Sequence, residues 1–533
     1  MTTAATADPV RPPLPRDNPR SARKMLVIAI IVLAAVAVRL VFFSYRSGDY
    51  TAYFAQWYAY ISDHGGFAAL KTDFANYNEP YLYLLAALTY LPVPALAGIK
   101  AMSVVFDFLL AFFAYRIVNL RYPNKWWPIL AGAIVLFLPT VVLNSSMWGQ
   151  ADAMYGALGI GAVYFLLRRR PWLACLFFGL AFSFKLQIVF LFPLLLLLVL
   201  RKWVPWRALL AIPVVYVLLD VPALLLGASP GAVFSLYATQ TSTYDQLTLN
   251  APNVYQYLST TTSTALRYGG IAVTGIALLA LIVPVAVKRV PLTPLRIVLA
   301  ATVSALLVPY FLPAMHERYF YLADVLTVLA AFYLPRKLWA LPILEQFASL
   351  FSYLPFLLMT GGGGRGGFGG TGQRPALPTQ GTGGLPGGFP GGYGGRGFGG
   401  GSGGGSGSGG YGGGNGGGGF AGGRAGGFAG GGSGGGFGGA GGGGFGGGGR
   451  GVSGAGGGSG TAVIPFSILA TAMLAALVLA VWVAVREFRR ADFAENPLGI
   501  TSESVKKPVA EPDPGDSRDD QPVELDGQVW GSG

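Results

Sequence analysis

The chain of 533 residues has little charge, one cysteine and two histidines. Only 11% of its residues are charged whereas 52% are hydrophobic, and the mean hydropathy is +0.51. Soluble globular domains are rarely so apolar, which argues against that class. The lone Cys175 excludes a disulfide framework. Two histidines without further ligands at metal-binding spacing speak against a zinc site.

Nucleotide-binding motifs and a cleavable leader are also missing. No P-loop or dinucleotide-binding signature occurs outside a glycine-rich tract, whose glycines lack the flanking strand and helix of those motifs. The first apolar run follows Arg20, Arg23 and Lys24 but has no small-residue cleavage site. We therefore interpret that run as a membrane anchor rather than a signal peptide.

Long apolar runs are what the sequence does contain. A run of about 18 to 20 residues can cross the hydrocarbon core of a bilayer as a helix. The runs predict an all-α polytopic protein of the cell membrane, with about 12 transmembrane helices and membrane lipids around it. They span 25–43, 81–98, 101–119, 126–143, 151–167, 172–184, 187–200, 207–226, 268–288, 294–312, 319–334, 338–359 and 461–485.

Basic clusters between the runs set the expected orientation, because Lys and Arg mark cytoplasmic helix ends. With both termini inside, an odd number of crossings must separate the first loop from the next basic cluster. We therefore expect 101–119 to cross the membrane and 81–98, broken by two prolines, to lie at its outer surface. The loops 44–100 and 227–267 then lie outside, and the polar motifs gather on this extracytoplasmic side.

The runs divide the chain into five segments. Residues 1–24 and 486–533 are expected to be disordered cytoplasmic tails, 25–360 the main transmembrane module, and 461–485 the last span. The segment 361–460 holds 61 of the 81 glycines. Its arginine and aromatic spacing can bind single-stranded RNA. Because the orientation places it outside the cell, we interpret it as a disordered loop and expect no nucleic acid partner.

The first outer loop gathers carboxylates and aromatic rings. Asp49, Tyr53, Gln56, Trp57 and Tyr60 recur at helical spacing, which predicts one face of a short surface helix. An Asp at such a position is either a helix N-cap or an acid or base beside a lipid-borne substrate, and both alternatives stay open. Most of the Tyr and Trp residues here are typical of an interfacial belt.

The motif SSMWGQAD places three polar or aromatic side chains at the outer mouth of a helix. Asp152 alone would fit helix capping. Together with Trp148 and Gln150, it suits the binding of sugar hydroxyls or the orientation of a base. Asp73 and Glu79 of the first loop are further candidates for binding a sugar or an acceptor.

Three cations lie at outer ends of the expected spans, namely Lys100, Lys185 and Arg318. A buried unpaired lysine is costly, so Lys185 needs an anionic partner. That partner is either a carboxylate, Asp152 or Glu317, or the phosphate of a lipid, which suits both Lys and Arg. The sequence leaves these two alternatives open.

The order of these motifs resembles the GT-C superfamily of membrane glycosyltransferases. The pattern consists of an acidic first outer loop, the surface helix NEPYLYLL, then WGQAD, FKLQ, a longer outer loop and HERY, spread over about residues 25–335. It is most similar to bacterial polyprenyl-phosphate-mannose-dependent enzymes and protein O-mannosyltransferases. Family members commonly carry two acidic residues in the first loop, whereas here Asp49 stands alone beside Tyr50.

The resemblance implies that the module transfers a sugar, mannose or another hexose, from a polyprenyl-phosphate donor by one inverting displacement. The acceptor would be a hydroxyl of a glycan, lipid or protein of the cell envelope, and Asp49 would be the catalytic base. No cofactor or metal is implied. The donor phosphate would be bound by Lys100, Lys185, Arg318 and His316. The sugar or acceptor would be bound by Trp148, Gln150, Asp152, Asp73 and Glu79.

Two other classes remain open. A lipid or sugar transporter or flippase would also carry charges inside the bundle, but at mid-membrane depth and with an internal repeat. A scaffold whose functional part is the glycine-rich loop would lose its function when 361–460 is deleted, whereas a glycosyltransferase would keep most of its activity.

Overall fold

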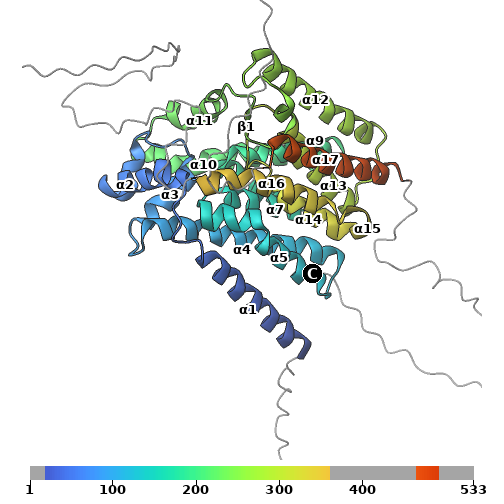
Figure 1. The fold of residues 1–533 in the computed structure, drawn as a ribbon, viewed down its shortest axis with the longest axis horizontal. Coiled ribbons are helices and arrows are strands. Elements are labelled where there is room, and N and C mark those ends of the chain that lie inside the picture. Colours follow the sequence, from blue (N-terminus) through green and yellow to red (C-terminus); the bar gives the residue numbers. More distant parts are fainter. Residues whose placement is uncertain (1–18, 360–463, 491–533) are drawn as a thin grey trace, which may run out of the picture. The chain divides into compact units, whose positions relative to one another are not determined.

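The computed structural model defines residues 19–359 and 464–490 of the chain (Figure 1). The glycine-rich tract 361–460 lies outside the described residues, as do nearly all residues of the two expected tails. The described chain is built almost entirely from helices, which agrees with the predicted all-α class.

The helices pack both against neighbours in the sequence and against more distant helices, with α7 in contact with α4 and α8, and α17 in contact with α13 and α16. In chain order, the helices of the described residues are α1 (Pro19–Leu40), α2 (Ala55–Asp63), α3 (Glu79–Leu88), α4 (Ala95–Arg121), α5 (Trp127–Phe137), α6 (Pro139–Val142), α7 (Asp152–Leu167), α8 (Pro171–Phe184), α9 (Phe192–Leu200), α10 (Ala211–Leu226), α11 (Pro230–Ser242), α12 (Thr264–Val287), α13 (Pro294–Phe311), α14 (Tyr321–Tyr333), α15 (Pro335–Leu338), α16 (Leu341–Met359) and α17 (Phe466–Arg489).

Six helices within residues 19–359 and 464–490 are long and apolar enough to cross a membrane. A bent pair, Trp127–Phe137 and Pro139–Trp148, meets at 51° and makes a seventh if the pair is one broken span. This is the pattern of a multi-pass membrane protein. The number of 12 spans stays a prediction. The six helices are Ala95–Arg121, Trp206–Leu226, Thr264–Val287, Pro294–Phe311, Leu341–Leu358 and Phe466–Arg489.

The expected surface helix 81–98 is divided in the structure. Its first part forms α3, which ends at Leu88, and residues from Ala95 onward belong to α4. Pro92 and Pro94 lie in the break, where each ring removes a backbone donor and restricts the residue before it. The result is a short helix beside the first loop, followed directly by a long apolar one.

The helix of the first outer loop differs from the expected one. It passes through a π-helical segment, Tyr50–Phe54, before continuing as α2. A π-turn holds one residue more than an α-turn and so rotates the residues that follow it. Trp57 and Tyr60 are buried while Tyr53 and Gln56 are exposed. The prediction that Asp49 and these four residues share one face is therefore wrong.

Two short parallel strands are an addition to the all-α prediction. β1 (Thr248–Leu249) pairs with β2 (Met315–His316). The pairing ties the loop 227–267, which also contains the unexpected helix α11, to the segment just before α14. Through this pairing the backbone at His316 is held in place by a distant part of the chain.

A buried ion pair joins the first helix to the bundle. Arg39 Nε lies 2.8 Å from Asp107 Oδ2, and both side chains are buried. The guanidinium also donates to the carbonyls of Ala35 at 3.2 Å and Leu136 at 3.0 Å, and Ser145 Oγ donates to the same carboxylate oxygen at 2.6 Å. The pair thus links α1, α4, α5 and the segment before α7.

Removal of one partner from this pair should destabilise the protein strongly. Arg39→Met leaves the Asp107 carboxylate buried without a compensating charge, which typically costs about 3–5 kcal/mol. We expect a marked fall in the melting temperature of the purified protein in detergent. The double variant Arg39→Met/Asp107→Leu removes both charges and should recover most of the loss. Equal melting temperatures of the single and double variants would contradict this assignment.

Candidate active site

The Asp49 carboxylate is held by two side chains of the WGQAD motif. Its Oδ2 accepts hydrogen bonds from Trp148 Nε1 at 3.1 Å and from the side-chain amide of Gln150. Asp49 makes no capping bond to its own helix, so the N-cap alternative is wrong. Within residues 19–359 and 464–490, its Oδ1 accepts no hydrogen bond. One oxygen is therefore fixed while the other remains able to accept a proton.

The backbone turn at Gly149 supports this arrangement. Gly149 has a φ of 79°, a left-handed conformation that favours a residue without Cβ. On one side of the turn, Ser47 Oγ donates to the Trp148 carbonyl at 2.6 Å, and on the other side, Ser103 Oγ donates to the Gln150 carbonyl at 2.7 Å. The two residues that hold the carboxylate are thus themselves anchored through their backbone.

Asp152 is fully buried in the first turn of α7, and both of its oxygens have partners. Oδ1 lies 2.5 Å from Lys185 Nζ, and Oδ2 accepts a hydrogen bond from Asn144 Nδ2 at 2.9 Å. Arg318 Nε lies 3.7 Å from Oδ2. A carboxylate is therefore the partner of Lys185 in this state of the protein. These contacts run between side chains, so helix capping does not explain Asp152.

Arg318 connects the carboxylates of Asp152 and Glu317. Its Nη1 donates to Glu317 Oε1 at 2.9 Å, and its guanidinium lies 5.4 Å from the centroid of the Trp148 ring. Burial acts to lower the pKa of Arg318, but the charges of Glu317, Asp49 and Asp152 outweigh it and raise that pKa. Arg318 Nε is buried yet has no hydrogen-bond partner in the described part of the chain. Arg318 therefore stays charged and keeps an unused donor.

His316 is positioned beside this group by β2. Its Nδ1 lies 3.7 Å from Glu317 Oε2, and its ring packs edge-on against Tyr244 with a centroid distance of 5.2 Å. Burial lowers the pKa of His316, so the ring is neutral at pH 7 and brings no positive charge. Burial acts to raise the pKa of Glu317, but the contacts with His316 and Arg318 hold it below its usual value.

The structure thus brings most of the candidate residues into one connected group. Hydrogen bonds, ion pairs and ring contacts link side chains from the first loop, the WGQAD motif, the segment after α8 and the HERY motif. We name this set the Asp49 group. Its members are Asp49, Trp148, Gln150, Asp152, Lys185, His316, Glu317 and Arg318.

Lys100 is not part of the Asp49 group. Its Nζ donates to three backbone carbonyls, those of Phe42 at 2.7 Å, Phe43 at 3.3 Å and Tyr45 at 2.5 Å. An ammonium has three donors, and all of them are used here. Lys100 therefore holds the chain just after α1, and we correct its predicted role as a phosphate ligand to this structural one.

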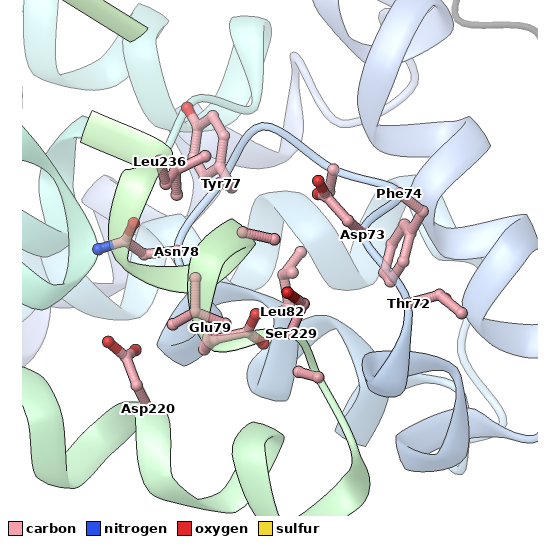
Figure 2. A pocket seen from close by; sticks show the side chains of 14 residues that line it. Thr72, Asp73, Phe74, Tyr77, Asn78, Glu79, Leu82, Asp220, Ser229 and Leu236 are labelled. Atoms are coloured by element: carbon pink, nitrogen blue, oxygen red, sulfur yellow. The ribbon is translucent and has the colours of Figure 1, made fainter. Parts of the chain in front are cut away.

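Asp73 and Glu79 line a separate pocket beside the Asp49 group, together with Asp220 of α10 (Figure 2). Tyr77 also lines this pocket, and its hydroxyl donates to Gln150 Oε1 at 3.4 Å. We name it the Glu79 pocket. Burial, with Asp220 and Asp73 as further causes, raises the pKa of Glu79 to about 7. Tyr77 thus connects the pocket that the two expected acids line to Gln150, one of the side chains that hold Asp49.

Stability should depend on pH through Glu79. The pKa of Glu79 in the folded protein, about 7, exceeds the ordinary 4.5, so the folded state binds the proton more tightly than the unfolded state does. The contribution of this proton to the free energy of unfolding is fully present below pH 4.5 and is lost as the pH rises through 7. The contribution is at most about 3 kcal/mol. We expect the melting temperature to fall between pH 5 and pH 8 by more in the wild type than in Glu79→Gln. Parallel pH profiles of the two proteins would contradict a buried, proton-binding Glu79.

Several residues of these sites were not candidates in the sequence. Asn144, Tyr77, Asn78 and Asp220 belong to them through contacts or pocket lining. A signal for Asp220 does exist, because a carboxylate inside the apolar run LLDVP is expensive in a membrane span and marks a functional position. The asparagines and the tyrosine carry no such signal, since loops and helix ends contain these residue types for ordinary reasons.

Comparisons with known proteins do not assign the chain to a family. No protein-family model matches it, and no curated protein matches it. Within residues 19–359 and 464–490, no cluster of three or more His, Cys, Asp or Glu side chains has an arrangement that could hold a metal ion. The functional conclusion therefore depends on the side-chain geometry.

Proposed function

We propose that the chain is an inverting glycosyltransferase of the membrane that moves a hexose, such as mannose, from a polyprenyl-phosphate donor to an acceptor hydroxyl. The observation that carries this proposal is the Asp49 carboxylate, fixed through one oxygen and open at the other, beside a charged arginine with an unused donor. The charge of Asp49 acts on Arg318, and a base and a cation in one connected group suit a reaction that removes a proton and releases an anion.

In this mechanism Asp49 Oδ1 takes the proton from the acceptor hydroxyl as the oxygen attacks the anomeric carbon. The bond from that carbon to the donor phosphate breaks, and its electron pair leaves with the polyprenyl phosphate. Trp148 and Gln150 keep the carboxylate oriented during the proton transfer. A positioned base of this kind typically contributes about 10²–10⁴-fold to the rate.

The departing phosphate is stabilised by the cations of the Asp49 group. Arg318 supplies the positive charge of its guanidinium, and Lys185 has further donors besides the one directed at Asp152. Neutral His316 supplies a hydrogen bond rather than a charge. Asp152, Trp148 and Gln150 would face the sugar. This division of roles follows from the chemistry of each side chain in its observed surroundings.

The proposal includes the topology expected from the basic clusters. About 12 spans, with both termini in the cytoplasm, place the Asp49 group at the extracytoplasmic rim of the bilayer. The shorter apolar helices Asp152–Leu167, Pro171–Phe184, Leu186–Leu200 and Tyr321–Tyr333 supply additional crossings beside the six long helices. A donor with a long isoprenoid chain can reach such a site directly from the lipid phase.

A transfer assay tests the proposal. Membranes that contain the protein are incubated with polyprenyl-phosphate sugars labelled in the sugar, and the labelled products are identified. We expect one hexose donor to be consumed and its label to appear on a glycan, lipid or protein. Consumption equal to that of membranes without the protein, for every hexose donor, would overturn the proposal.

A transporter or flippase is the second candidate, and a specific observation favours it. Asp324 of α14 and Glu345 of α16 are fully buried within apolar helices, and Gln346 Nε2 donates to Asp324 Oδ1 at 3.0 Å and to Glu345 Oε2 at 3.1 Å. Carboxylates inside a bundle are common on transport pathways. The same assay separates the two functions, because a transporter moves the labelled donor across the membrane without consuming it.

A further inference from the structure

Three buried hydrogen-bond acceptors on residues that line the Glu79 pocket have no partner. Asp220 Oδ2, Asn78 Oδ1 and Glu79 Oε2 are buried atoms that receive no hydrogen bond. Asp220 is 1% exposed and Asn78 is 4% exposed, and both side chains line the pocket (Figure 2). A buried acceptor left without a donor is unfavourable, so three in one pocket indicate that a ligand or water completes them.

The orientation of the Asn78 amide is fixed by its neighbours. Its Nδ2 donates to the hydroxyl of Tyr237 at 2.7 Å. That hydroxyl uses its own hydrogen to bond the carbonyl of Phe182, so it can only accept from Asn78. The amide therefore cannot turn around, and its carbonyl oxygen must face the pocket as an acceptor.

None of the residues that line the Glu79 pocket donates a hydrogen bond to these three atoms. The lining contains no Lys, Arg or His. The Thr72 hydroxyl donates to the Ala69 carbonyl at 2.8 Å, and the Tyr77 hydroxyl donates to Gln150. The pKa of Glu79, raised to about 7, leaves this carboxyl partly neutral at pH 7, so it attracts cations less strongly and can itself donate one O–H to a ligand. A neutral ligand with several hydroxyl groups fits such a surface.

The position of the pocket relates it to the Asp49 group. Thr72, Asp73 and Ser229 at its rim are exposed, whereas Asp220 and Asn78 at its floor are buried. The ring of Phe74 also lines the wall, and aromatic faces pack well against the C–H face of a sugar. Because Tyr77 belongs to the pocket wall and bonds the amide that holds Asp49, a ligand here lies next to the proposed base.

We propose that the Glu79 pocket is the acceptor subsite and binds a neutral, hydroxyl-rich carbohydrate through Asp220, Asn78 and Glu79. This inference rests on the proposed function and narrows its acceptor from a glycan, lipid or protein to a sugar chain. Vicinal hydroxyls donate to the carboxylate oxygens and to the fixed amide carbonyl. The hydroxyl that reacts extends past Tyr77 towards Asp49.

Binding and kinetics of the full-length protein test the inference separately. Saturation-transfer NMR without any donor compares methyl α-mannoside, methyl α-glucoside and putrescine on the wild type, on Asp220→Asn, and on Asp63→Asn. Asp63 is exposed on α2 in the same loop and gives a matched control. We expect at least one neutral glycoside to bind, about tenfold more weakly in Asp220→Asn, and equally in Asp63→Asn. In the transfer assay, Asp220→Asn should raise the acceptor KM by a similar factor with little change in kcat.

The possible results distinguish the two proposals. Binding of putrescine alone, or glycoside binding that Asp220→Asn leaves unchanged, overturns the carbohydrate subsite even if sugar transfer is observed. Glycoside binding that depends on Asp220, in a protein that transfers no sugar, supports the subsite and removes the proposed reaction. If Asp220→Asn lowers the melting temperature substantially, Glu79→Gln provides the same comparison at a second residue of the pocket.

Discussion

Asp49→Asn should reduce the initial rate of sugar transfer by about 10²–10⁴-fold while the protein folds normally. Asparagine keeps a side-chain oxygen that can accept the hydrogen bonds from Trp148 and Gln150, so the local structure should persist. It cannot take a proton from the acceptor hydroxyl, because an amide oxygen is far too weak a base. The rate is measured with labelled donor at saturating acceptor.

Asp63→Asn is the matched control for this experiment. Asp63 is an exposed carboxylate of α2 and makes no contact with the Asp49 group, so its variant should transfer sugar at the wild-type rate. Melting temperatures of both variants should equal that of the wild type within a few degrees. Turnover by Asp49→Asn close to the wild-type rate would show that Asp49 is not the base.

Arg318→Gln should have the second largest effect, a loss of about 10²–10³-fold in kcat. The substitution removes the cation that we propose to stabilise the departing phosphate, and glutamine keeps a polar but shorter side chain. Arg318→Lys keeps the charge but loses the planar fork, so we expect an intermediate rate. Both variants are measured with the same labelled donor.

The control for Arg318 is a surface arginine from the first outer loop. Arg46 is exposed, and Arg46→Gln removes one positive charge from the same region without touching the Asp49 group. A general electrostatic effect on donor binding would lower the rates of Arg46→Gln and Arg318→Gln alike. Only a specific loss at Arg318, with a melting temperature that remains high enough for the assay, agrees with phosphate stabilisation.

Apolar patterning predicted most of the helices because a helix in contact with lipid requires a long run of apolar residues. The run 151–167 became Asp152–Leu167, and 294–312 became Pro294–Phe311. The π-helical segment Tyr50–Phe54 and the pairing of β1 with β2 had no such pattern. The strand pairing joins segments that are distant in the sequence, which the local order of residue types does not encode.

Part of the candidate site could be predicted from the sequence because charged residues are few. Asp49, Asp152 and Lys185 were conspicuous because a charge is rare in this chain and expensive near a membrane. Lys100 was equally conspicuous, but its three carbonyl partners come from the turn after α1 and could not be foreseen. The sequence shows which charged side chains need a compensating partner, and only the fold shows whether that partner is a backbone group or a side chain.

The lipid product provides the most direct measurement of the central claim. The purified full-length protein in liposomes receives one polyprenyl-phosphate hexose, labelled in both the sugar and the lipid, and a carbohydrate acceptor. We predict that each sugar transferred releases one free polyprenyl phosphate, at a rate that falls with Asp49→Asn. Recovery of the intact donor, with no label on the acceptor and no free polyprenyl phosphate, would contradict glycosyl transfer by this protein.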